Sequence, residues 1–129
     1  MPEIAGIVRD AMVYRAGREY ELHAWVVMPN HVHMLVTPLR GLPEIMHSLK
    51  RFTAREANRV LGLTGRAFWE DESYDRLVRN DVEFGRIAGY VEMNPVQAGL
   101  CRSAEEFRWS SAWRIANPPQ DTILPHIIG

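Results

Sequence analysis

Hydrophobic residues near the start of the chain recur at helical spacing and predict a first helix that ends near Gly17. Residues 20–28 are rich in strand-forming side chains, and a second such stretch covers residues 31–37. Only Pro29 and Asn30 separate the two stretches, so an antiparallel hairpin is the simplest arrangement. Alternation along the first strand predicts one face formed by Leu22, Ala24 and Val26.

An amphipathic pattern over residues 43–61 predicts a long second helix that begins at Pro43. Gly62 stands where a glycine commonly ends a helix in the left-handed conformation. The predicted inner stripe consists of Ile45, Met46, Leu49, Phe52, Thr53 and Val60. On the opposite side, Arg51, Arg55 and Arg59 recur at four-residue steps.

Residues 74–79 predict a short third strand, and Asn80 or Asp81 is expected to cap a third helix over residues 82–93. The residue before a proline resists the helical conformation, so Asn94 and Pro95 are expected to end or kink this helix. The predicted order is α-β-β-α-β-α, an α+β fold with helices on one or both faces of an antiparallel sheet.

The length of 129 residues, without repeats or linkers, predicts a single domain with an irregular tail over residues 117–129. The lone Cys101 excludes an internal disulfide and a cysteine zinc cluster, and it favours a reducing compartment. The sequence shows no signal peptide and no apolar run long enough to cross a bilayer. A cytoplasmic location is therefore expected.

The formal net charge of −1 does not by itself favour a polyanionic partner. Basic residues nevertheless outnumber acidic ones over residues 40–66, whereas acidic residues predominate over residues 67–86. One basic face could bind nucleic acid at this net charge. Two solvated surfaces of opposite sign explain the same distribution equally well.

His31 and His33 project from the same face of the second strand, because alternate strand residues share a face. Two neighbouring imidazoles suit a divalent metal. Spacing alone favours the plainer alternative, in which one histidine is buried and hydrogen-bonded while the other is solvated. His23, on the neighbouring strand, is a further candidate to approach this site, and His47 and His126 are expected at the surface.

Tyr90 and Asn94 lie one turn apart on the same side of the third helix. Ile87 and Val91 define the inner stripe of that helix, and Tyr90 borders it. The alternative is that both residues are structural. A tyrosine at this border usually packs its ring in the core and exposes its hydroxyl to water, and an asparagine before proline is a common turn residue.

The two pairs occur in longer motifs, VVMPNHVHMLV and YVEMNPVQAGL, which are separated by a basic helix. In this combination the chain resembles the REP-associated tyrosine transposases, relatives of the IS200-like transposases. These are HUH nucleases, named for a histidine-hydrophobic-histidine triplet. The resemblance continues through SLKRFTAREAN, FWEDESYDRLVRN and RWSSAW, so it covers roughly residues 20–113.

The resemblance implies a role for each of these residues. His31 and His33 would bind Mg²⁺ or Mn²⁺, with Asn94 completing the metal site, and Tyr90 would be the nucleophile. A phenol is neutral at pH 7, so it needs help to act as a phenolate. Attack on DNA would give a 5′-phosphotyrosine and a free 3′-hydroxyl, and the retained bond energy would allow rejoining without ATP.

The resemblance also implies a substrate: single-stranded DNA beside the imperfect hairpins of repetitive extragenic elements. Phosphate contacts or base stacking would come from Lys50, Arg51, Arg55, Arg59, Arg76, Arg79 and Trp69. The alternatives are a solvated helix face for the arginines and a core position for Trp69, and a core position is the favoured one for Phe68.

The family's fold is ferredoxin-like (RRM-like), with the order β-α-β-β-α-β. This sequence starts almost at the first helix, so the family's first strand is expected to be missing. The chain would then be a truncated remnant, form a homodimer in which a second copy covers the open sheet, or have its true start upstream.

Three other functions stay open at this stage. A hairpin DNA-binding protein of the same fold without cleavage activity would bind DNA and form no covalent adduct. An unrelated metal-dependent phosphodiesterase that uses only the histidine pair would keep its activity in Tyr90→Phe. A structural interaction module would need neither metal nor DNA.

Overall fold

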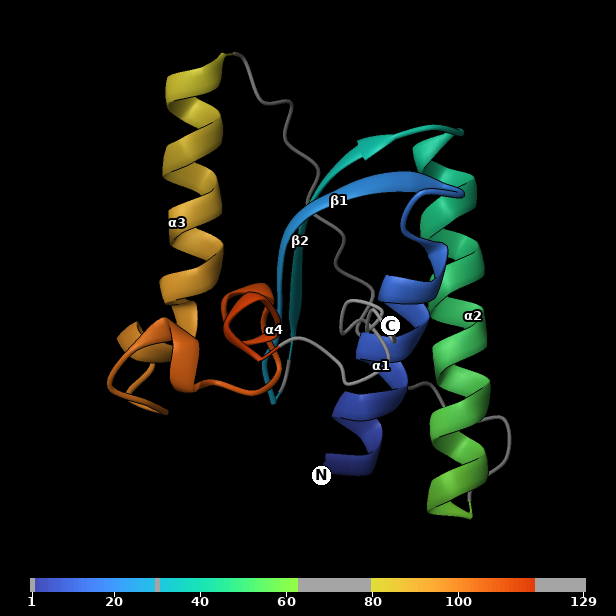
Figure 1. Cartoon of the computed structure of the whole chain (residues 1–129). Helices are drawn as coiled ribbons and strands as arrows, with labels where there is room; N and C mark the ends of the chain where they lie inside the picture. The colour runs from blue at the N-terminus through green and yellow to red at the C-terminus, as the bar shows by residue number, and fades with distance from the viewer. Residues whose placement is uncertain (1, 30, 63–79, 118–129) are drawn as a thin grey trace, which may run out of the picture.

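The structure is a computed structural model in which residues 2–29, 31–62 and 80–117 are described (Figure 1). Its elements are α1 (Pro2–Arg15), β1 (Tyr20–Val27), β2 (Val32–Pro38), α2 (Leu42–Leu61), α3 (Asp81–Gln97), the short 3-10 helix η1 (Ala104–Glu106) and α4 (Ser111–Ala116). The α+β class is confirmed. The predicted third strand at 74–79 and the tail from 118 onward lie outside the described residues.

Strands β1 and β2 form the predicted antiparallel hairpin, from Tyr20 opposite Pro38 to Val27 opposite Val32. The other edge of β1 is also occupied, because the Val27 N–H donates to the carbonyl of Trp109 (2.7 Å). Ser110 extends this contact as an antiparallel bridge to Val26. Within the described ranges the sheet thus has two strands, and residues 109–110 cover part of the other edge of β1.

A β-bulge interrupts the register between Leu22 and Ala24. The extra residue reverses the alternation, so Leu22 packs with the α1 side of the sheet while Ala24 and Val26 pack on the α3 side. The prediction that these three residues share one face is therefore wrong. Trp25 and Val27 are buried as well, because helices cover both faces of β1.

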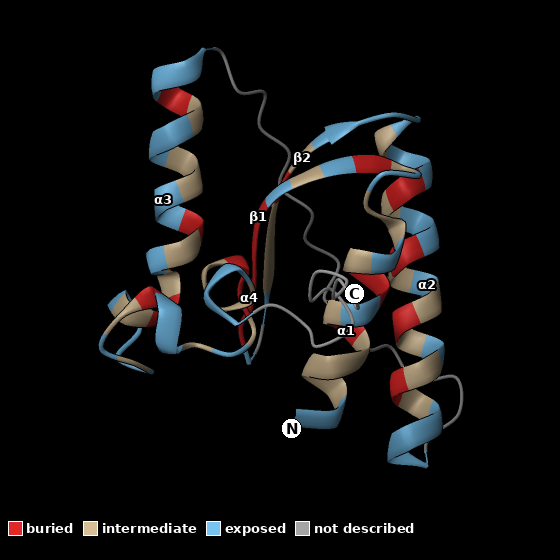
Figure 2. Ribbon diagram, in the orientation of Figure 1, coloured by how far each residue is buried: buried red, intermediate tan, exposed pale blue. Residues whose placement is uncertain are grey.

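The interior consists of two clusters, one on each face of the hairpin. The first joins α1 and α2 to the sheet through Val8, Ala11, Met12, Trp25, Val27 and Leu49. The second joins α3 to the sheet through Ala24, Val26, Met28, Leu35 and Val91. Figure 2 shows buried residues where α1 and α2 face each other, with exposed residues along their outer sides.

Helix α2 ends as predicted, with Gly62 in the left-handed region (φ 72°). Its buried stripe follows four-residue steps through Ile45, Leu49, Thr53 and Ala57. Val60 was predicted to be internal but is 43% exposed, because the last turn of α2 extends past the N-terminal end of α1 (Figure 1).

Helix α3 begins as predicted, with the side chain of Asn80 accepting a hydrogen bond from the Glu83 N–H (2.9 Å). It does not end at Asn94, because it continues through Pro95 to Gln97. Burial of the Pro95 ring offsets the one hydrogen bond that a proline removes. The Leu100 N–H donates to the Pro95 carbonyl (2.9 Å) and closes this end of the helix.

No helix within residues 2–29, 31–62 and 80–117 is long and apolar enough to span a membrane.

Candidate nuclease site

The two histidines of the triplet lie together at the start of β2. Their ring centroids are 4.8 Å apart and the rings are nearly perpendicular (79°). Across the gap to α3, the ring of Tyr90 lies 6.0 Å from that of His33. The structure therefore brings His31, His33 and Tyr90 together, although 57 or more residues of sequence separate the histidines from the tyrosine.

His33 is half-buried between its strand and α3, whereas His31 is exposed. Burial lowers the pKa of His33, and the neighbouring His31 lowers it further. Both effects favour the neutral imidazole at neutral pH. A neutral ring has a lone pair available to a metal ion or a proton.

Tyr90 is 54% exposed, so its ring is not part of the core. Val91, the next residue, is buried against β1, and this contact turns Tyr90 towards the histidine side. Asn94 lies one turn further along α3 and is half-buried. Among the described residues, no hydrogen bond joins its side chain to His33.

The donor set for a metal is partial. Residues 2–29, 31–62 and 80–117 contain no group of three or more His, Cys, Asp or Glu side chains that could hold an ion. Two adjacent imidazoles fit two positions of a divalent metal, and the Asn94 amide is a candidate for a third. An incomplete protein shell leaves positions for water and phosphate oxygens, as a catalytic site requires.

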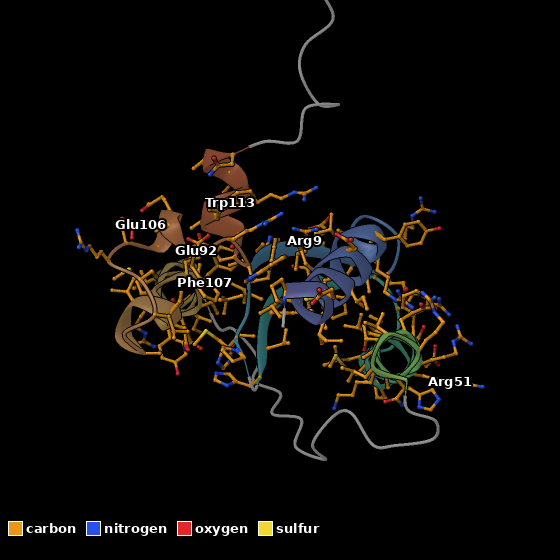
Figure 3. The ribbon with its side chains drawn as sticks, turned by 90° about the horizontal axis from the view of Figure 1, so that it is seen from below. Arg9, Arg51, Glu92, Glu106, Phe107 and Trp113 are labelled. Atoms are coloured by element: carbon orange, nitrogen blue, oxygen red, sulfur yellow. The ribbon has the colours of Figure 1, made fainter. Side chains whose placement is uncertain are left out.

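A polar network that sequence reasoning missed ties the tyrosine helix to the hairpin. The Ser111 hydroxyl, at the start of α4, donates to the Glu92 carboxylate (2.7 Å). The same hydroxyl accepts the Trp25 N–H of β1 (3.0 Å). Figure 3 shows Glu92 on the side of α3 that faces α4. Only the motif RWSSAW, which contains Ser111, marked this segment in the sequence.

His23 does not join the histidine pair within the described residues. Its Nε2 lies 2.7 Å from the Thr37 hydroxyl across the hairpin, and its ring packs edge-on against Phe84 (5.1 Å). Its contacts are those of a residue that stabilises the packing of α3 on the sheet.

The basic residues of α2 that were predicted to contact DNA do not lie around Tyr90. Arg51, Arg55 and Arg59 are exposed on α2, which lies on the other side of the sheet from α3 (Figure 1). Arg59 is paired with Glu56 (2.8 Å), and Lys50 is half-buried. The remaining candidates, Arg76, Arg79 and Trp69, lie outside the described residues, as does Phe68.

Comparison with known proteins gives concordant results. The family model for IS200-like transposases matches residues 11–94. A REP-associated tyrosine transposase of Escherichia coli (strain K12) is 25% identical over 109 residues, which are 84% of this chain and 64% of that protein. The chain thus spans a little under two thirds of the length of this relative.

A solved structure of a REP-associated tyrosine transposase bound to a REP hairpin is also similar. It matches with a TM-score of 0.66 and 25% identity, over 86% of this chain and 67% of that one. The family model covers more than half of the chain and includes the histidine triplet, Tyr90 and Asn94. The chain therefore belongs to the IS200-like transposase family, as its sequence motifs predicted, and within it resembles the REP-associated tyrosine transposases.

Proposed function

We propose that this protein cleaves and rejoins single-stranded DNA beside hairpin elements through a covalent bond to Tyr90. The observation that carries the proposal is the position of the Tyr90 ring. It is exposed, and it lies 6.0 Å from the ring of His33, which is itself 4.8 Å from that of His31. A nucleophile beside two potential metal ligands is the arrangement that phosphodiester cleavage needs.

In the cleavage step, the Tyr90 oxygen forms a bond to the scissile phosphorus as its proton passes to solvent. The bond from phosphorus to the 3′ oxygen breaks, and that oxygen takes up a proton and leaves as a free 3′-hydroxyl. The product is a 5′-phosphotyrosine. Attack by a 3′-hydroxyl reverses the step and rejoins the strand without an external energy source.

His31 and His33 would hold a Mg²⁺ or Mn²⁺ ion, with Asn94 as the candidate third ligand. Such an ion, when bound, polarises the phosphate and stabilises the negative charge that develops on it. The lowered pKa of His33 supports this assignment, because only the neutral imidazole can coordinate a metal. The network from Ser111 through Glu92 to α3 holds the tyrosine helix against the strand that carries the histidines.

Hairpin DNA is the proposed substrate, because a structurally similar family member is bound to a REP hairpin. A cytoplasmic location and a homodimer stay predictions from the sequence.

The deciding experiment is a denaturing gel that detects a covalent protein–DNA adduct. The protein is mixed with single-stranded hairpin oligonucleotides, with Mn²⁺ or with EDTA, beside Tyr90→Phe. Tyr14→Phe is a matched control, since Tyr14 is an exposed tyrosine on α1. A metal-dependent adduct in wild type and Tyr14→Phe, absent from Tyr90→Phe, is the expected result. An adduct that persists in Tyr90→Phe would exclude Tyr90 as the nucleophile.

A hairpin-binding protein without cleavage activity is the second candidate. The similarity to a family member bound to a REP hairpin supports it, because that complex concerns binding and not cleavage. Its signature is tight binding of the hairpin by wild type with no adduct at any metal concentration. Strand cleavage that survives in Tyr90→Phe would instead indicate a phosphodiesterase that depends on the histidines alone.

A further inference from the structure

A basic pocket lies between α1 and α2, on the opposite side of the sheet from Tyr90. It has a volume of about 270 Å³ and is lined by Arg15, His47, Ser48, Arg51, Phe52 and Arg55. Nothing in the proposed cleavage step uses these residues.

Arg15 supplies a guanidinium group that is held in place. Its guanidinium donates to the Ser48 hydroxyl (3.2 Å) and lies over the Phe52 ring, 5.3 Å from the centroid. Its Nε is 3.0 Å from a carboxylate oxygen of Glu19, but the N–H is not aligned with any acceptor. The side chain is only 12% exposed, so little conformational freedom is left to lose when an anion binds.

Arg51 and Arg55 supply charge that no described carboxylate neutralises. Both are exposed, and neither lies within ion-pair distance of an acidic side chain in the described part of the chain. The Arg55 guanidinium lies over the Phe52 ring at 5.8 Å, on the same ring that supports Arg15. Figure 3 shows Arg51 projecting outward from α2.

Other arginines along α2 differ in this respect. Arg59 is bound to Glu56 (2.8 Å), and Arg40, just before the helix, lies 3.9 Å from Glu44. Among the described residues of α2, the arginines without a carboxylate partner are therefore those at the pocket, Arg51 and Arg55, and Arg15, paired with Glu19, adds a fixed hydrogen-bond donor. Three guanidiniums, a hydroxyl and an imidazole around one hollow match the oxygen-rich surface of a phosphate group.

We propose that this pocket binds a backbone phosphate of the hairpin stem. The proposal rests on hairpin DNA being the substrate. Because the pocket and Tyr90 lie on opposite sides of the sheet, a phosphate in the pocket belongs to a part of the DNA away from the scissile bond (Figure 1). The paired stem supplies such a phosphate, so the pocket would position the hairpin while its single-stranded flank reaches Tyr90.

The test compares two double variants that remove the same number of charges. Arg51→Gln with Arg55→Gln empties the pocket of its unpaired guanidiniums. Arg40→Gln with Arg59→Gln removes two paired charges outside it. Affinity for a fluorescent hairpin oligonucleotide is measured over a salt series, and thermal melting shows that both variants are folded.

The pocket variant is expected to bind the hairpin roughly tenfold more weakly at low salt. The slope of log K against log[salt] should fall by roughly 0.9 for each phosphate that the variant no longer neutralises, and by less in the control. Equal changes in the two variants would overturn the proposal, because general electrostatics would then explain both. Inorganic phosphate that shifts the NMR signals of His47, with hairpin affinity unaltered in the pocket variant, would also overturn it.

These outcomes are separate from the test of the proposed function. If wild type binds the hairpin but forms no adduct, the cleavage proposal fails and the binding series still decides the role of the pocket. If wild type forms the adduct and the two double variants bind the hairpin equally well, the proposed role of the pocket is excluded and the proposal of cleavage by Tyr90 stands.

Discussion

Tyr20 and Tyr90 show how differently the two faces of the hairpin are built. Tyr20, at the start of β1, is fully buried, and its hydroxyl donates to the carbonyl of Met12 (2.7 Å). Burial raises the pKa of Tyr20 to about 12. Tyr90, on α3, is 54% exposed and faces His33. The same residue type thus stabilises the packing of α1 on one face and is a candidate nucleophile on the other.

The difference follows from what covers each face. Two long helices cover one face, and their cluster with the sheet contains Met12, Trp25 and Leu49. In the described part of the chain, α3 and Phe107 pack on the other face, where His31 and Tyr90 are exposed. A buried phenol with a satisfied hydroxyl cannot reach DNA, whereas an exposed phenol beside two imidazoles can. Stability and chemistry are therefore expected to respond to different substitutions.

The largest expected effect is the loss of adduct formation in Tyr90→Phe, since no other described side chain replaces the phenol oxygen at that position. Stability should change by no more than about 0.5 kcal/mol, because the residue is exposed. The gel measures the first effect and urea unfolding the second. A clearly destabilised Tyr90→Phe would contradict the view that this tyrosine is outside the core.

The next effect concerns the histidines. His33→Ala should lower the rate of adduct formation by about 10²-fold or more, because a catalytic metal contributes several kcal/mol to the transition state. Mn²⁺ titration of the single-turnover rate is the measurement. His23→Ala, which removes a histidine engaged with Thr37, is the control. Equal rate losses in both variants would indicate that the effect arises from packing.

Ser111→Ala would test the connection between the two regions. It leaves the Glu92 carboxylate and the Trp25 N–H without their partner, so unfolding free energy should fall by up to about 3 kcal/mol. The adduct rate should fall more than hairpin affinity does, because α3 loses its fixed position. Ser103→Ala is the control, since Ser103 makes no side-chain cap hydrogen bond at η1. An adduct rate in Ser111→Ala equal to that of the wild type would show that Ser111 does not position α3 for the reaction.

Tyr20→Phe should have the smallest effect, a loss of about 1–2 kcal/mol in stability with adduct formation intact. It leaves the Met12 carbonyl without its donor. The pKa also predicts a pH dependence. The folded state favours the neutral phenol, so this contribution is complete below pH 10 and is lost as the pH rises from 10 to about 12. Alkaline unfolding curves of wild type and Tyr20→Phe should therefore converge above this range.

Much of the local structure could be predicted because its causes lie within a few residues. Gly62 ends α2 through its own backbone conformation, and Asn80 caps α3 through a bond to Glu83. Strand alternation placed His31 beside His33, and helical spacing placed Asn94 one turn from Tyr90. These features, with the motifs around them, were enough to predict the family.

Local rules also failed where packing outweighed them. Pro95 was expected to end or kink α3, and the helix does not end there but continues to Gln97 with the Pro95 ring buried. The bulge before Ala24 reversed the face on which Leu22 packs. Val60 is exposed because the last turn of α2 extends past the N-terminal end of α1. In each case the deciding contacts come from another element.

The sequence by itself determined the three long helices, the hairpin and the identity of the chemistry-bearing side chains. Only the tertiary structure decided that Tyr90 meets His33, that Ser111 holds Glu92, and that Arg15 meets Ser48 beside Arg55. The physical reason is the range, along the chain, of the interactions that decide each feature. Backbone conformation and capping depend on neighbours along the chain, whereas a site assembled from β2 and α3, or from α1 and α2, depends on how buried faces pack together.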